Sequence, residues 1–370
     1  MYRRDTGGRA FIGATAGESA LTQDNIRLMT DADAERWDAF IAAHPLGKAM
    51  ATTRGLKAWQ ASGWSQHLLG AFEGQEVVAG AVACTKKLPH LPWTVARITT
   101  FASGGQDRAA TASALLAAVR ALARRLRAAE IESRCLIPEG VVLNGIPFHA
   151  DVREELLQAG YAETNSRQGT YMVRIDVDDE SLMQSFRSKC RRDARKGLRE
   201  GVTNEPLDAR EDFGFFCESH REMCRRKGLP PVSEAVYEGM RPMVEAGHLR
   251  LFGARYDGHV QNMALVDALG IPRYTLGVAT PGAYEKGVPP TGQALHFGIM
   301  QWCRDHGKAF YDLGGSPGPE PQPGDPNFSV WQFKYEFGGD YVYMIPYYRR
   351  SLGVFGGALM RLARRLGKLG

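Results

Sequence analysis

Basic residues cluster in one short stretch of this sequence, and their spacing suits the binding of a polyanion. Positions 187 to 199 hold seven cations against a single acid, Asp193. The cations are Arg187, Lys189, Arg191, Arg192, Arg195, Lys196 and Arg199. In a helix, Arg191, Arg195 and Arg199 share one face, which at about 1.5 Å per residue extends over about 12 Å. Such a face can follow the phosphates of a nucleic acid, and a solvated basic helix explains the pattern equally well.

A second candidate for chemistry is the carboxylate of Asp312. It lies at the end of a predicted strand over 309–313, and α/β sheets often place functional groups where strands end. We expect Asp312 either to orient a substrate or to cap the turn that follows. The histidines form no metal-binding or catalytic-triad spacing, and the six cysteines include no CxxC pair. The sequence therefore predicts no metal, no cofactor, and buried reduced thiols.

Two similar series of elements are predicted to position these residues. The sequences at 69–83 and 252–266 both indicate strand, turn and strand, and the two hairpins start 183 residues apart. Each hairpin is preceded by two helices and followed by a strand, a helix with apolar residues at helical spacing, and another strand. This order is that of a GNAT N-acyltransferase domain. The predicted fold is therefore α/β (α+β), with two tandem GNAT-like domains that each contain a mixed sheet flanked by helices. Chance similarity between two α+β halves is the alternative.

The chain is expected to carry an addition at each end of these domains. Residues 1–25 are predicted to be a disordered leader, followed by domain 1 over 26–165 and domain 2 over 166–339. Residues 351–370 have the pattern of a basic amphipathic helix, which either packs on its own domain or contacts the anionic inner membrane. Because the sequence shows no signal peptide and no apolar span of membrane length, we expect a cytoplasmic protein, membrane-associated if that helix docks there.

Several motifs resemble those of one enzyme family, FemABX. They are 311–315 (YDLGG), 331–339 (WQFKYEFGG), the basic stretch 191–202, and Trp37-Asp-Ala-Phe40 with Trp59. The resemblance implies two GNAT-like domains with a cleft between them, and it implies that 340–350 completes domain 1. Members of the family move an amino acid from aminoacyl-tRNA to an amine, usually on a peptidoglycan precursor, and some relatives aminoacylate small molecules.

The resemblance also suggests roles for individual residues. Lys334 matches the lysine that family members place beside the tRNA 3′ end, and it is the candidate catalytic cation together with Asp312, which would orient the amine. Phe333 matches an aromatic residue that contacts the terminal nucleotides, and Tyr274 a tyrosine of the cleft. The predicted tRNA-binding residues are Lys189, Arg191, Arg192, Arg195, Lys196 and Arg199. The structural alternative is that Phe333 is a core residue and Lys334 a surface lysine.

The donor and the acceptor are less well indicated by the sequence. Neither 103–108 nor 289–293 has the Gly-rich spacing with which GNAT domains hold coenzyme A, which favours aminoacyl-tRNA as donor. A GNAT-like N-acyltransferase that uses acyl-CoA or a carrier protein is the second hypothesis, and a non-catalytic tRNA- or lipid-binding module is the third. Apolar residues stand where relatives bind the phosphates of a nucleotide-linked precursor: Ala61, Val232, Val236 and Leu276. We therefore expect a smaller or more apolar amine as acceptor.

Overall fold

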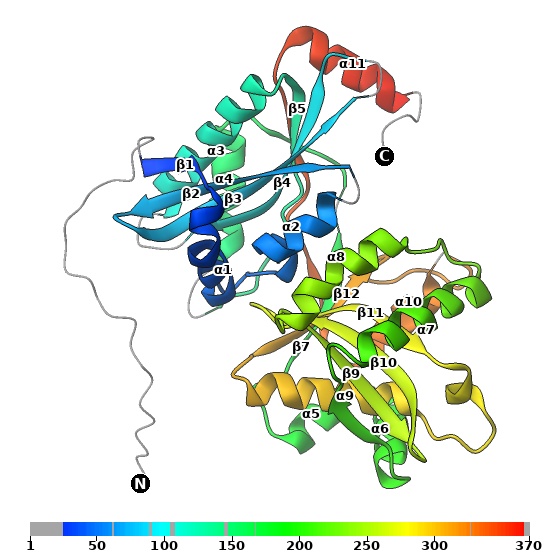
Figure 1. Ribbon diagram of the computed structural model, residues 1–370. Coiled ribbons are helices and arrows are strands. Elements are labelled where there is room, and N and C mark those ends of the chain that lie inside the picture. The colour runs from blue at the N-terminus through cyan, green and yellow to red at the C-terminus, as the bar shows by residue number, and fades with distance from the viewer. Residues whose placement is uncertain are drawn as a thin grey trace.

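The computed structural model describes residues 25–365, except 61–62, 89–90, 104–107, 144–146, 167 and 326. All but the last residue of the predicted leader, and the end of the predicted C-terminal helix beyond 365, lie outside the described residues. The described chain forms two lobes, drawn one above the other in Figure 1. None of its described helices is long and apolar enough to cross a membrane.

The first half of the chain builds the upper lobe of Figure 1. Its elements are β1 (Ile26–Leu28), α1 (Ala34–Ala43), α2 (Thr53–Gln60), β2 (Ser65–Glu73), β3 (Glu76–Lys87), β4 (Thr94–Ser103), α3 (Arg108–Arg125), β5 (Ala128–Ser133), α4 (Phe148–Gln158) and β6 (Ala162–Glu163), with short 3-10 turns η2 (Asp31–Asp33) and η3 (Ala49–Ala51). The predicted helical spacing of Leu115, Leu116 and Val119 buries all three in the core of this lobe, where α3 lies against the sheet.

The second half builds the lower lobe and then returns to the upper one. Its elements are β7 (Gly169–Arg174), α5 (Asp179–Ser185), α6 (Ser188–Arg199), β8 (Thr203–Pro206), α7 (Asp212–Lys227), α8 (Glu234–Glu245), β9 (Leu249–Tyr256), β10 (His259–Asp267), β11 (Arg273–Ala279), η4 (Pro281–Tyr284), α9 (Thr291–Asp305), β12 (Phe310–Ser316), α10 (Phe328–Tyr335), β13 (Asp340–Tyr343), β14 (Tyr348–Ser351) and α11 (Val354–Arg365). The predicted turn of the second hairpin lies at Asp257 and Gly258, both with positive φ, as a tight two-residue hairpin turn requires.

The two sheets have the same strand order. The first runs β1-β2-β3-β4-β5-β14-β6, and the second, read from its opposite end, runs β8-β9-β10-β11-β12-β7-β13. In each sheet the fourth and fifth strands of this order are parallel and the other recorded pairs are antiparallel. The internal repeat found in the sequence therefore corresponds to two copies of one architecture.

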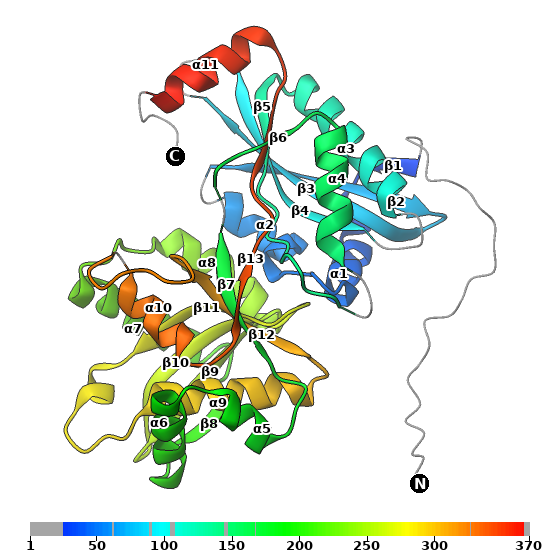
Figure 2. The ribbon, with the colours of Figure 1, turned by 180° about the vertical axis from the view of Figure 1, so that it is seen from behind.

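The two sheets exchange strands, which corrects the expected domain boundaries. Residues 340–350 were expected to complete domain 1, but Asp340–Tyr343 forms β13 at the edge of the second sheet, and only Tyr348–Ser351 enters the first as β14. The segments that lead into β7 and β14 run side by side, with Met344 N donating to Gln168 O at 2.9 Å and Tyr347 N to Ser166 O at 3.2 Å. Figure 2 shows β7 and β13 adjacent where the chain passes between the lobes.

A second correction concerns the helices of the lower lobe. One of the two helices expected before the second hairpin, over 182–200, is divided into α5 and α6 by extended backbone at Phe186 and Arg187. Phe186 is buried between Phe297 and Phe337, so its core contacts interrupt the helix. The sequence repeat also missed α8, whose Gly239 allows the helix to lie directly against Ala58 of α2 across the lobe interface.

Candidate active site

A cavity of about 680 Å³ lies between the two lobes, and both lobes contribute to its walls. Its position follows from the second sheet, where β11 and β12 run parallel and are recorded as paired at Arg273 and Asp312. Beyond that pair, Tyr274 on β11 and Gly314 on β12 both face the cavity. Residues from the upper lobe, including Lys48 before η3, close the other side. The cavity therefore lies where the two central parallel strands separate, against the neighbouring lobe.

Lys334 projects from α10 into this cavity. Only 7% of the residue is exposed, and its Nζ donates to Gly315 O at 2.6 Å. Burial lowers the pKa of Lys334 to about 8, with a further lowering by Arg273 that Asp312 opposes. Gly314 makes this approach possible, because it has a φ of +78° and a Cβ there would lie 2.6 Å from Tyr274 O. The predicted catalytic lysine is thus a buried cation at a wall of the cavity, and the surface-lysine alternative is excluded.

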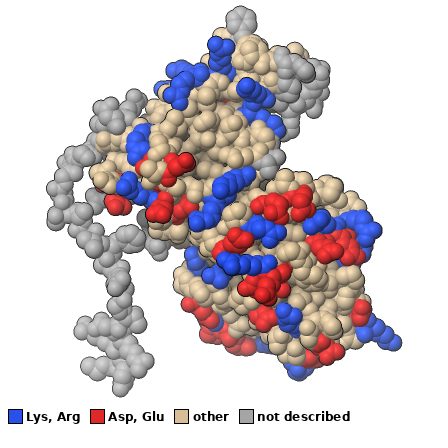
Figure 3. Space-filling model, viewed as in Figure 1, with Lys and Arg blue, Asp and Glu red and all other residues tan. Residues whose placement is uncertain are grey.

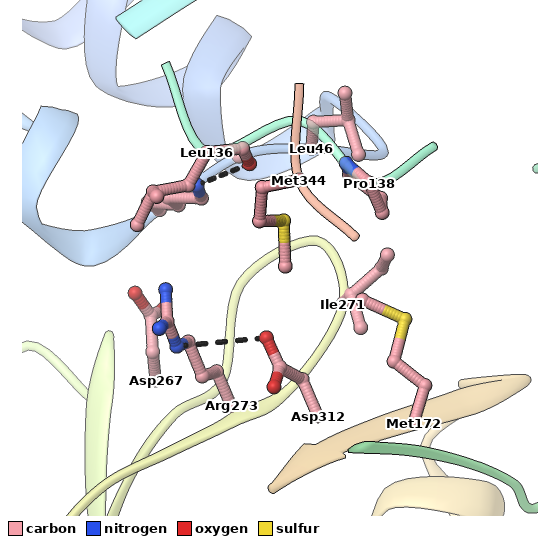
Figure 4. A pocket seen from close by; sticks show the side chains of 11 residues that line it. Leu46, Leu136, Pro138, Met172, Asp267, Ile271, Arg273, Asp312 and Met344 are labelled. Atoms are coloured by element: carbon pink, nitrogen blue, oxygen red, sulfur yellow. Dashed lines mark hydrogen bonds and ion pairs between the residues drawn. The ribbon is translucent and has the colours of Figure 1, made fainter. Parts of the chain in front are cut away.

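Asp312 lies close enough to Lys334 for its negative charge to oppose the lowering of the lysine's pKa. Its carboxylate accepts a hydrogen bond from Gly314 N at 2.7 Å and one from the Thr170 hydroxyl. Its other oxygen is 3.5 Å from Arg273 Nε, and Figure 4 shows the two side chains facing each other in a small pocket of about 30 Å³ that shares residues with the cavity. Asp312 therefore does cap the following turn, and in doing so it fixes the strand end whose Gly315 carbonyl holds Lys334.

The two predicted aromatic residues differ in position. Tyr274 lines the cavity, 6.0 Å from Lys334 Nζ measured to the ring centroid, and burial raises the pKa of its hydroxyl to about 12. Phe333 is half-buried and packs edge-on against His296 and Phe337, with centroids 5.4 and 5.2 Å apart, and it is not one of the described residues that line the cavity. A core-packing role is therefore observed for Phe333, and its contact with nucleotides stays a prediction.

His296 belongs to the same cluster and was not singled out by the sequence. It is 3% exposed, its ring lies 4.7 Å from that of Tyr274, and its Nδ1 is 3.1 Å from the Tyr311 hydroxyl. Burial, and then the charge of Lys334, lower the pKa of His296 to about 3. The imidazole is therefore neutral at physiological pH, and it supports the aromatic wall without adding a charge.

The predicted tRNA-binding residues lie on α6, which packs against α9 in the lower lobe (Figure 1). The N-terminal end of α6 is close to the end of α10, because Lys189 Nζ is 3.2 Å from Glu336 and the Arg187 guanidinium lies 3.6 Å from the Tyr335 ring centroid. The other cations pair near the protein surface: Arg191 with Gln184, Arg192 with Asp193, Arg195 with Glu180, and Lys196 and Arg199 with Glu200. On the face drawn in Figure 3, basic and acidic side chains of the lower lobe are likewise interspersed. Exposed pairs of this kind stabilise a fold little and exchange readily for other anions.

Five charged residues of the cavity were missed by the sequence reasoning: Arg273, described above, and four others. Lys48 donates to Leu136 O at 2.8 Å, and burial, then Arg273, lower its pKa to about 8. Asp267 accepts from Ala49 N at 2.9 Å, and burial raises its pKa to about 6. The other two are Arg97 and Arg134. No spacing in the sequence connects these residues with Lys334, since the fold brings them together from distant positions.

The positions expected to make the acceptor site apolar are only partly at the cavity. Leu276 lines it, whereas Val232 and Val236 are half-buried around α8, and Ala61 lies outside the described residues. Of the two segments compared with the coenzyme A loop, 103–108 and 289–293, only the second can be described, because 104–107 are outside the described residues. There Gly197 of α6 lies so close to Pro290 O that a Cβ would be 2.4 Å away, so α6 covers the start of α9.

Comparisons with known proteins agree with this architecture. A family model described as an acetyltransferase (GNAT) domain matches residues 184–328. A lipid II:glycine glycyltransferase from Staphylococcus saprophyticus subsp. saprophyticus is 23% identical over 84% of this chain and 92% of its own length. The crystal structure of FemX superposes with a TM-score of 0.76 at 20% identity, covering 91% of this chain and 99% of FemX. The C-terminal domain of a putative lysylphosphatidylglycerol synthetase from Agrobacterium fabrum gives 0.56 at 14% identity, over 90% and 96% of the two chains.

The fold and the matches define the class as an acyltransferase with tandem GNAT-like domains. Within that class, the predicted resemblance to the FemABX family is confirmed, and the chain is a FemABX-like aminoacyltransferase.

Proposed function

We propose that this enzyme transfers an amino acid from aminoacyl-tRNA to an amine on a cell-envelope precursor, and that the cavity between the lobes is where the amide forms. The observation that carries the proposal is the buried Lys334, a cation held at 2.6 Å by Gly315 O in a cavity large enough for two reacting groups. The curated relatives act on lipid II according to their names, which favours a cell-envelope precursor over a free small molecule as acceptor.

The reaction needs positioning and charge stabilisation more than covalent catalysis, because the ester of an aminoacyl-tRNA is already activated. The acceptor nitrogen attacks the ester carbonyl carbon, the C–N bond forms, and the C–O bond to the terminal ribose breaks. One proton leaves the nitrogen, and one is taken up by the departing ribose oxygen. Lys334 would stabilise the tetrahedral oxyanion, a contribution of about 3–4 kcal/mol for a single well-placed donor. Asp312 would act indirectly, by fixing Gly314, Gly315 and Arg273 around that lysine.

The donor would approach from the side of α6. Lys189 and Arg187 contact Glu336 and Tyr335, which directly follow Lys334 in the chain. A row of cations that begins there and continues along α6 can follow the phosphates behind a 3′ end whose ester lies beside Lys334. The cover that α6 provides at the start of α9 supports a donor other than acyl-CoA in this lobe.

We also propose that α11 brings the enzyme to an anionic membrane surface. One side of the helix is fixed to the upper lobe, where Met360 is buried with Leu88 and Ala129. Val354 and Leu362 remain 83% and 53% exposed, and Leu91 in the nearby β3–β4 connection is 40% exposed. Exposed apolar residues on a basic helix favour an interfacial location. Sedimentation with vesicles containing phosphatidylglycerol tests this: binding by the full chain and loss of binding in Leu362→Glu are expected, whereas equal sedimentation of both proteins would contradict it.

Transfer of labelled amino acids from total charged tRNA to candidate acceptors tests the proposed function. Wild-type protein is expected to form labelled amide, and Lys334→Ala to lose at least tenfold in rate while it keeps its circular dichroism spectrum. Lys57→Ala, at an exposed position on α2, is the matched control and should retain full activity. Amide formation from acyl-CoA without charged tRNA, or full activity in Lys334→Ala, would contradict the proposal.

A further inference from the structure

The cavity carries more positive charge than the attack of an amine on an ester requires. Five cationic side chains line it, together with the carboxylate of Asp267. Two more carboxylates pair with the cations from behind the wall: Asp312 with Arg273, and Glu132 with two arginines. The five cations are Lys48, Arg97, Arg134, Arg273 and Lys334. The lining of the cavity is therefore rich in cations.

The excess is greatest at the upper-lobe wall. Arg97 on β4 and Arg134, which follows β5, both pair with Glu132, and Arg349 on β14 contacts the same carboxylate at 2.8 Å. Glu130 is a weaker neighbour, 3.9 Å from Arg349. Glu132 is 6% exposed and is contacted by three guanidinium groups, so three cations are gathered at this wall.

Aromatic rings hold the two lining arginines in place. The Arg97 guanidinium lies 4.6 Å from the Trp64 ring centroid, and that of Arg134 lies 5.0 Å from Tyr347. Stacking on aromatic faces keeps a guanidinium extended and leaves its N–H groups in a fixed plane. Such fixed guanidinium groups are suited to a phosphate or carboxylate, which accepts two parallel hydrogen bonds.

This wall faces a different ligand from the one beside Lys334. Arg97 and Arg134 come from the first half of the chain, whereas Lys334, Tyr274 and the basic face of α6 all come from the second. If the ester of the donor lies beside Lys334, the opposite wall is left for the acceptor. The positive charge of that wall then indicates a negative group on the acceptor.

We infer that Arg97 and Arg134 form a subsite for an oxyanion, a phosphate or a carboxylate, carried by the amine acceptor. The inference rests on the proposed function, which supplies the amine. It changes the expectation from the sequence, because apolar residues at the positions compared there suggested a more apolar acceptor. The acceptor group that enters the cavity is then an amine with a negative charge close by.

The two buried lysines support this assignment. Burial, and the charge of Arg273, lower the pKa values of Lys48 and Lys334 to about 8, so both lose protons more easily than an exposed lysine. An anion in the cavity would raise both pKa values again. Binding near pH 8 should therefore take up protons, and calorimetry in buffers with different ionisation enthalpies measures that uptake.

Calorimetric titration with three small amines tests the subsite directly on the full chain. The amines are phosphoethanolamine, β-alanine and ethanolamine, which carry a phosphate, a carboxylate and a neutral hydroxyl. At least one of the anionic amines is expected to bind at least tenfold more tightly than ethanolamine, and the tighter of the two identifies the kind of oxyanion. Arg134→Gln should lose this preference, whereas Arg210→Gln, at an exposed arginine outside the cavity, should keep it.

Arg134→Lys is the second variant, because it keeps a cation beside Glu132 if the glutamine variant fails to fold. It should still lose most of the preference, since lysine cannot form two parallel bonds. Equal binding of the three amines, no binding of either anion at millimolar concentration, or an unchanged preference in a folded Arg134 variant would overturn the inference. Transfer from charged tRNA at equal rates to ethanolamine and phosphoethanolamine would overturn the subsite alone. Anion binding without any transfer would overturn the proposed donor alone.

Discussion

Replacing Lys334 with methionine is expected to stabilise the protein while it abolishes transfer. The wild-type lysine keeps a charge in a site where burial opposes it, and its pKa falls from the usual 10.5 to about 8. Methionine has a similar length and no charge, so it removes this cost and fills nearly the same space. A protein is expected to keep a destabilising buried charge where that charge serves the reaction.

The size of the effect follows from two opposing contributions. The difference between 10.5 and about 8, at about 1.4 kcal/mol for each pH unit, corresponds to about 3 kcal/mol of unfavourable charge burial in the native state. Little solvent screening reduces it, because Lys334 is only 7% exposed. Methionine leaves Gly315 O without its donor, which costs about 1–2 kcal/mol. The variant should therefore gain about 1–2 kcal/mol in its free energy of unfolding at neutral pH.

The gain should depend on pH in a defined direction. Because the pKa of Lys334 is lower in the native state than in the unfolded state, the native wild type binds fewer protons between about pH 8 and about pH 10.5. Wild-type stability at this site therefore rises with pH across that interval. The advantage of Lys334→Met is greatest below about pH 8 and declines above it. Urea unfolding at neutral pH and at about pH 9.5, followed by circular dichroism, measures both values.

Lys57→Met on α2 is the matched control. Its side chain is exposed, so the free energy of unfolding should change by no more than about 0.5 kcal/mol and independently of pH. The reasoning is refuted if Lys334→Met is less stable than wild type at neutral pH, or if its difference from wild type is the same at both pH values. Either result would mean that Lys334 is well solvated or well paired in the native state.

Three further outcomes are expected. The initial rate of transfer should fall as pH rises through about 8, where Lys334 loses its proton. Lys334→Arg should lack this fall and Lys48→Met should keep it, whereas an unchanged pH profile in Lys334→Arg would assign the fall to another group. Gly314→Ala should lose activity and about 1–3 kcal/mol of stability in urea unfolding, because alanine is strained at a φ of +78° and its Cβ meets Tyr274 O. Activity and stability equal to those of wild type would show that this turn is not needed. Arg195→Gln should make the slope of log binding constant against log salt concentration shallower by about 0.7–0.9 for each tRNA phosphate that the variant no longer neutralises. A slope equal to that of wild type would exclude α6 from the tRNA site.

The sequence predicted the elements that are local in the chain. Each hairpin is defined by its own alternation and turn residues, and α3 and α9 by their apolar spacing, so these elements agree with the structure. The resemblance named Lys334 and Asp312, from two separate motifs, as members of one site, and the structure places both at the end of β12. The sequence left open whether Asp312 would orient a substrate or cap its turn, and only the hydrogen bond from Gly314 shows the second of these.

What the sequence did not predict depends on contacts between distant residues. The family resemblance predicted the return of the chain to the first domain, where β14 pairs with β5, but it did not predict that Asp340–Tyr343 pairs with β7 in the second sheet. The break between α5 and α6 depends on Phe186 reaching Phe337, far along the chain. Arg97 and Arg134 look like ordinary strand residues in the sequence. Only the strand exchange, which brings Tyr347 beside Arg134, shows that they line a cavity opposite Lys334.

The central claim is that a buried lysine cation between the two lobes stabilises the charge that forms when an amine displaces the tRNA. The most direct measurement is the single-turnover rate of amide formation with enzyme in excess over purified aminoacyl-tRNA, compared between wild type, Lys334→Met and Lys57→Met. A fall of at least tenfold in the Lys334 variant alone, with unchanged tRNA affinity, is the predicted result. Equal single-turnover rates in all three proteins would contradict it.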